Sequence, residues 1–169
     1  MSEFLTTLHA KINAVVQIVG LSEDESGAIF DILFVEPPTE EQQAQVDAIV
    51  ADWPLEKAKL EKLAQVDADW KTTLQAGWTS PAGWKLGIDI SDVTLLTGAF
   101  MLAKETQAMG LDVPVTITDM PGAAHNLNLA ELTGLMLAYG QARAALSSAD
   151  AARRRAINAA TTPEELETL

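Results

Sequence analysis

The 169-residue chain contains no cysteine. It can therefore form no disulfide, and it offers neither a thiolate nucleophile nor a cysteine-based zinc site. It also lacks an apolar run near the ~20 residues that cross a bilayer, and its first residues lack the basic start of a signal peptide. We therefore expect a protein that is soluble where it is made, is compatible with a reducing cytoplasm and does not insert into a membrane.

Basic residues are scarce. The 11 lysines and arginines face 24 aspartates and glutamates, which gives a formal net charge of −13. Because such a charge repels a phosphate backbone, nucleic acid is not an expected partner. The one basic cluster, residues 153–155, is interpreted as a solvated helix face or as a pairing site for Glu164, Glu165 and Glu167, rather than as a phosphate site.

Aromatic residues make up only 5% of the chain, whereas hydrophobic residues, many of them alanine, make up 48%. This composition favours closely packed helices over a β-sandwich or barrel. The chain is also long enough to bury a core without disulfides or metals. We expect an α+β, mainly helical fold, with a small N-terminal hairpin/helix module at 1–53 and a helical domain at 54–169.

The N-terminal module is predicted to contain a helix and a β-hairpin. Apolar residues recur every three or four positions in 4–15, which is the spacing of an amphipathic helix. Apolar stretches at 15–21 and 29–35 flank a polar loop, as the strands of a hairpin do. Thr39 with Gln42 three residues later forms the pattern of a capping box, which predicts that a helix follows.

The larger domain is predicted to contain three helices and a second hairpin. In order, we expect a helix from Pro54 to Gly77, a glycine-rich connector at 77–87, a helix at 91–109, a short hairpin at 115–129 and a long alanine-rich helix at 129–160. Trp78 and Trp84 of the connector are expected to cover the edge of a core that they share with Trp70. An indole that faces solvent there would instead be a partner-binding aromatic.

The last helix carries a stripe of small side chains, here called the alanine seam. Its members follow one another at steps of four and three: Ala138, Ala142, Ala145, Ala149, Ala152, Ala156 and Ala159. This is coiled-coil spacing, and side chains this small let two helix backbones approach closely. The seam is open to three interpretations: a helix hairpin against 54–77, self-association of copies, or chance in an alanine-rich segment.

The sequence contains no recognisable catalytic, metal-binding or phosphate-binding motif. His9 and His125 have no companion at ligand spacing, so each is interpreted as a surface or loop residue. Asp67 and Asp69 point to different faces of a helix, and the acidic loop at 22–27 lacks the ligand order of a calcium loop. We therefore expect no enzyme activity, no metal and no cofactor.

Several short motifs of the larger domain occur in a recognisable order. They are Gly-Trp-Lys-Leu-Gly at 83–87, Leu-Leu-Thr-Gly-Ala at 95–99, Thr-Ile-Thr-Asp at 116–119, Leu-Ala-Glu-Leu at 129–132, Arg-Ala-Ile-Asn-Ala-Ala at 155–160 and Thr-Pro-Glu-Glu-Leu at 162–166. In this order they resemble an uncharacterised domain of tail-fibre and tail-associated proteins of tailed bacteriophages. That family brings no established catalytic residues.

The resemblance implies a location and a role. The location is a virion tail or baseplate, and the role is that of a structural protein that contacts other tail or baseplate proteins, or copies of itself. The alternative is a chaperone-like binding module that holds another tail protein during assembly and is absent from the finished particle.

Overall fold

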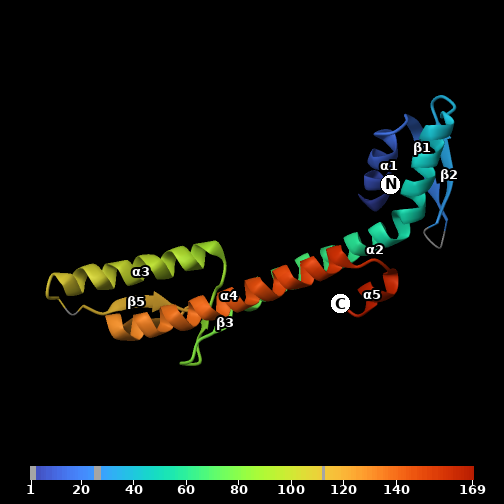
Figure 1. Ribbon diagram of the computed structural model, residues 1–169. Helices are drawn as coiled ribbons and strands as arrows, with labels where there is room; N and C mark the ends of the chain where they lie inside the picture. The colour runs from blue at the N-terminus through green and yellow to red at the C-terminus, as the bar shows by residue number, and fades with distance from the viewer. Residues whose placement is uncertain (1–2, 25–27, 112) are drawn as a thin grey trace. The chain divides into compact units, whose positions relative to one another are not determined.

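The computed structural model describes residues 3–24, 28–111 and 113–169, and it is mainly helical (Figure 1). Its elements are α1 (Glu3–Asn13), β1 (Ile18–Glu23), β2 (Ile29–Phe34), α2 (Glu40–Ala76), β3 (Trp78–Thr79), β4 (Lys85–Leu86), α3 (Ile90–Ala108), β5 (Val115–Thr118), β6 (Ala124–Leu127), α4 (Leu129–Ala159) and α5 (Pro163–Glu167). Within the described residues the strands form three antiparallel pairs, β1–β2, β3–β4 and β5–β6. The expected α+β, mainly helical fold is confirmed.

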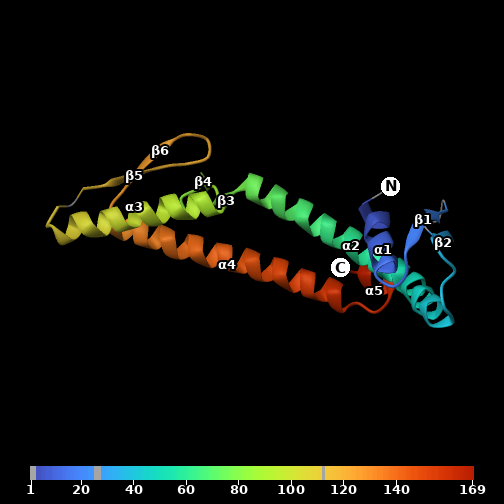
Figure 2. The same ribbon diagram turned by 90° about the horizontal axis from the view of Figure 1, so that it is seen from above.

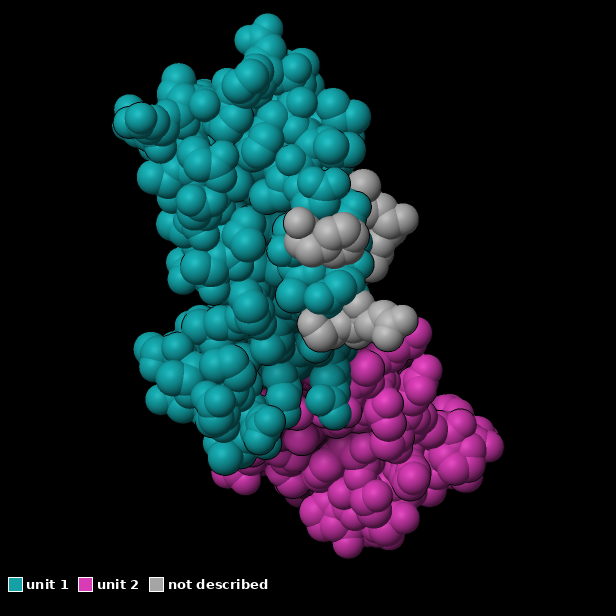
Figure 3. Space-filling model, turned by 90° about the vertical axis from the view of Figure 1, so that its right-hand side faces the viewer, with its two compact units in different colours: residues 1–65, 154–169 teal, residues 66–153 magenta. Residues whose placement is uncertain are grey.

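The chain divides into two compact units. The first unit comprises 1–65 and 154–169, and the second comprises 66–153 (Figure 3). The division falls inside α2 and inside α4, so both long helices contribute to both units. The boundary expected from the sequence, between 53 and 54, also lies inside α2.

The first unit packs α1 and the β1–β2 hairpin against the start of α2. Its core contains Leu8 and Ile12 of α1, Ile18 of β1, and Val46 and Trp53 of α2. The predicted helix and hairpin are therefore confirmed, and apolar residues of all three elements face this core. The polar loop expected at 22–27 lies partly outside the described residues.

The predicted capping box at the start of α2 is present. The Thr39 backbone N–H donates to Gln42 Oε1 at 2.9 Å, and the Gln42 N–H donates to Thr39 Oγ1 at 3.2 Å. These reciprocal bonds satisfy donors that would otherwise have no partner at the helix start. The prediction that a new helix begins at Pro54 is wrong, because this helix does not end before it.

α2 continues through Pro54 and reaches Ala76 as one helix. A proline inside a helix removes one backbone hydrogen bond and its ring crowds the preceding turn, so it bends the helix. α2 does change direction along its teal stretch, within the first unit (Figure 1). The helix continues because residues on both sides of the proline, Trp53 and Leu60, pack against the core of the first unit.

In the second unit, α3, the β5–β6 hairpin and the first half of α4 run side by side (Figures 1 and 2). Their shared core includes Leu96 and Ala103 of α3, Ile117 of β5 and Leu132 of α4. The predicted second hairpin and the long last helix are confirmed. α3 begins at Ile90, with Asp89 as its N-cap, slightly earlier than the sequence indicated.

Gly77 joins α2 to β3 in a backbone conformation that favours glycine. Its φ is +68°, and a Cβ at this position would lie 2.3 Å from Met120 Sδ and 2.6 Å from the Leu86 carbonyl oxygen. The absence of a side chain therefore lets the connector close against the β5–β6 turn. Gly134 of α4 is a matched control, because a Cβ there would meet no atom within 4 Å.

We predict that Gly77→Ala destabilises the protein. The left-handed conformation costs a non-glycine residue roughly 1–2 kcal/mol, and the two close contacts add to that. Gly134→Ala should instead raise the free energy of unfolding by up to about 1 kcal/mol, because alanine is the better helix former. Urea unfolding of both variants measures this, and equal effects would contradict the description of the Gly77 turn.

Candidate functional site

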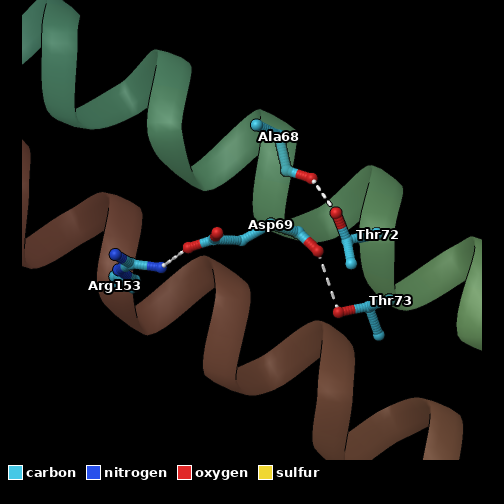
Figure 4. A network of polar contacts seen from close by, with 5 residues as sticks. All are labelled: Ala68, Asp69, Thr72, Thr73 and Arg153. Carbon is cyan, nitrogen blue, oxygen red and sulfur yellow. Dashed lines mark hydrogen bonds and ion pairs between the residues drawn. The ribbon is translucent and has the colours of Figure 1, made fainter.

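α2 and α4 are joined in the second unit by an ion pair (Figure 4). Arg153 Nη1 donates to Asp69 Oδ2 at 2.6 Å, and the Thr73 hydroxyl donates to the Asp69 carbonyl oxygen at 2.9 Å. The arginine cluster was expected to be solvated or to pair with the C-terminal glutamates, but Arg153 pairs with α2. Both side chains are partly exposed, so the pair contributes at most about 1 kcal/mol.

The alanine seam does not coincide with the buried face of α4. That face carries Leu132, Leu135, Tyr139 and Ile157. The structure places the seam residues in two groups: Ala138, Ala142 and Ala156 are partly buried, whereas Ala145, Ala149, Ala152 and Ala159 are exposed. In the middle of α4, small side chains thus lie open on the surface of the single chain.

Two of the three tryptophans that were expected to share a core pack against the core of the second unit. Trp78 meets Tyr139 edge to face, with ring centroids 5.6 Å apart, and Trp84 is partly buried over the same core. Trp70 lies elsewhere and lines a separate cavity with Leu146. The connector indoles therefore share a core, as expected, but Trp70 is not among the residues that pack there.

His125 has a partner that the sequence did not reveal. Its Nε2 lies 3.0 Å from Asp119 Oδ2, and its ring stacks on Trp84 at 4.0 Å with an angle of 16° between the planes. His125 lies in β6 and is partly buried, so its interpretation as a loop residue is wrong. The antiparallel register of β5 and β6 causes the contact with Asp119, because it pairs Thr118 with Ala124 and so returns the chain beside Asp119.

Asp119 lies just beyond the end of β5, buried and held on both carboxylate oxygens. Oδ2 contacts His125, and Oδ1 accepts the Ala123 backbone N–H at 2.7 Å. The hydrogen bond with His125, followed by those from the backbone, lowers the pKa of Asp119 below its usual value. The only sequence signal for this arrangement was an aspartate and a histidine on opposite sides of a Pro-Gly turn.

A cavity of about 320 Å³ lies between α3, β5 and β4. Leu95, Leu96 and Ile117 supply apolar wall, while Asp92 and Asp119 bring carboxyl groups to its lining. Asp92 is accommodated because the adjacent backbone is a glycine: a Cβ on Gly87 would lie only 2.0 Å from Asp92 Oδ2. No motif in the sequence indicated this cavity, since its walls come from separate segments.

The polar groups around the cavity are partly desolvated. Burial raises the pKa of the Asp92 carboxyl, and the negative charge of Asp89 contributes in the same direction. Burial also raises the pKa of Tyr139, whose hydroxyl donates to the Gly87 carbonyl oxygen at 3.0 Å. An apolar wall with carboxyl groups on it can accept a group that is both cationic and partly apolar.

The chain matches no known family model, no curated protein and no solved structure. In the part of the chain that the structure describes, no three His, Cys, Asp or Glu side chains gather as a metal site. Within the same residues, no helix combines the length and the apolar character needed to cross a bilayer.

We predict that Asp119 stabilises the fold in a pH-dependent way. Because its folded pKa is depressed, its contribution is present above the ordinary carboxyl pKa of about 3.9 and is lost as pH falls through the lower folded value. Asp119→Asn should therefore unfold at lower urea than the wild type at neutral pH, with the difference shrinking below about pH 4. A difference that stays constant down to pH 2 would contradict this role.

Proposed function

We propose that the protein is a structural component of a bacteriophage tail or baseplate, associated with the tail fibre, which acts through protein–protein contacts without catalysis. The phage assignment rests on the resemblance of the motifs between 83 and 166. The contact role is supported by one surface, the outer face of α3. A tail-fibre assembly chaperone is the alternative.

The outer face of α3 is apolar and unpartnered in the single chain. Leu95, Leu102 and the C-cap residue Met109 follow at steps of seven, and they are 73%, 55% and 67% exposed. Leu96 and Ala103, on the neighbouring face of the helix, are buried in the core. A helix that is apolar on two sides needs a second surface to cover the outer one, and exposed apolar patches of this kind mark interaction sites.

Mass spectrometry of purified particles tests the assignment and separates it from the alternative. A virion structural protein should be present in a fixed number of copies per particle. A chaperone should instead be found with a tail protein in the infected cell and be missing from the particle. Absence from both would contradict both forms of the proposal.

We predict that Leu102→Gln combined with Met109→Gln removes the contact but not the fold. Both side chains are exposed, so the free energy of unfolding should change by no more than about 0.5 kcal/mol. The number of copies per particle should fall. Leu137→Gln is the matched control, because Leu137 is 63% exposed on α4, away from this face. If the unaltered protein, the double variant and the Leu137→Gln variant are incorporated equally, α3 is not the contact surface.

A second prediction concerns contact between copies through the alanine seam. Ala145→Leu with Ala152→Leu adds bulk at exposed positions, so the melting temperature should stay unchanged. If copies pack closely here, the added bulk should destabilise the contact between copies by about 1–3 kcal/mol per site. Sedimentation should then shift from oligomer toward monomer. Ala130→Leu, exposed in the first turn of α4 and outside the seam, is the control. If the association state is unchanged in all variants, the spacing of the seam reflects only the high alanine content of the helix.

A further inference from the structure

The cavity beside α3 and the outer face of α3 form one continuous surface. Leu95 belongs to both, because it is 73% exposed on the helix and also lines the cavity. Met120 of the β5–β6 turn, which is 47% exposed, lines the cavity as well. A segment that covers the apolar face of α3 therefore passes the mouth of the cavity.

The cavity has the volume for a small group. At about 320 Å³ it lies at the lower end of the range of roughly 300–1,000 Å³ for ligand sites. It is lined by leucine and isoleucine side chains together with Asp92 and Asp119. A lysine or arginine side chain combines the two matching parts, since its aliphatic stem packs on apolar walls while its charged head pairs with a carboxylate.

The two carboxylates differ in how their charge is balanced. Asp119 is hydrogen-bonded to His125 and to the Ala123 N–H. Asp92 accepts the Asp89 N–H at 3.1 Å, and the charge next to it is the negative one of Asp89. An entering cation therefore stabilises the carboxylate of Asp92 more than that of Asp119.

The charge of the whole chain indicates what kind of partner docks here. Two copies would each carry a net charge of −13 and would repel one another at long range. A basic segment of another protein would instead be attracted and steered toward the acidic cavity. Charge complementarity thus favours a different, basic protein over a second copy.

We propose that the outer face of α3 docks an amphipathic helix of another tail protein, and that one lysine or arginine side chain of this helix enters the cavity and pairs with Asp92. The proposal rests on the proposed function, because it names the chemistry of the partner surface. The apolar face provides the buried contact area. The cavity fixes the register of the partner helix along α3, because the cation of the partner can enter at only one point.

Site-specific photo-cross-linking in infected cells tests the proposal. The photoreactive residue p-benzoylphenylalanine replaces Leu95 at the mouth of the cavity or, as a control, Leu137 on α4. We expect an adduct from position 95 whose partner peptide contains a lysine or arginine among apolar residues at helical spacing. Position 137 should give no such adduct.

Charge removal provides the second measurement. Asp92→Asn keeps an oxygen that can accept the Asp89 N–H but removes the charge, so the adduct yield should fall about tenfold. Glu61→Gln is the control, because it also removes one negative charge, but from an exposed residue of α2 that does not line the cavity. The adduct yield of this variant should stay near that of the unaltered protein.

A third measurement holds even if Asp92→Asn does not fold. The cross-linked partner segment is synthesised with its basic residue and again with a neutral isostere, citrulline for arginine or norleucine for lysine. The neutral peptide should bind the unaltered protein about tenfold more weakly. Equal binding of the two peptides would overturn the proposed pairing of a basic side chain with Asp92.

The remaining outcomes are also decisive. An adduct between two copies of this chain, or one with a segment lacking a basic residue, would overturn the proposed partner. No adduct at position 95 in particles that contain the protein would overturn docking on α3 while leaving the virion role intact. Absence of the protein from particles and from every tail-protein complex would instead remove the proposed function itself.

Discussion

The packing of α3 against the first half of α4 is the constraint on which the second unit depends. Leu132 of α4 is fully buried between apolar side chains such as Leu96 and Ala103 of α3. Tyr139, two turns further along, ties this core to the connector through Trp78 and the Gly87 carbonyl oxygen. Because this core covers only one face of α3, the apolar residues on the neighbouring face remain exposed.

In the proposed contact, the exposed face and the acidic cavity have different energetic roles. Covering three side chains that are half to three-quarters exposed contributes on the order of 1 kcal/mol each, which is a weak contact when taken alone. A charge placed at one point of such a face adds specificity, because a partner without the matching cation leaves a carboxylate poorly solvated. Area and charge together are typical of a contact that must form in one register.

Local patterns predicted most of the secondary structure. Both longer hairpins, the capping box at Thr39 and the last helix were found from the sequence, because each depends on residues only a few positions apart. Pro54 shows the limit of such patterns: locally it is a helix start, yet burial of residues on both sides keeps α2 continuous. Tertiary packing outweighed the local preference there.

Composition and spacing by themselves determined the fold class, the acidic character and the presence of an alanine stripe on the last helix. Only the tertiary structure decided which side chains meet. The pairing of His125 with Asp119 depends on strand register, and the cavity depends on residues from β4, α3, β5 and α4. The exposure of Ala145 and Ala152 likewise depends on which face of α4 the core occupies. Contacts between distant residues leave no periodic trace in the chain, so neither the site nor the free surfaces could be located from the sequence.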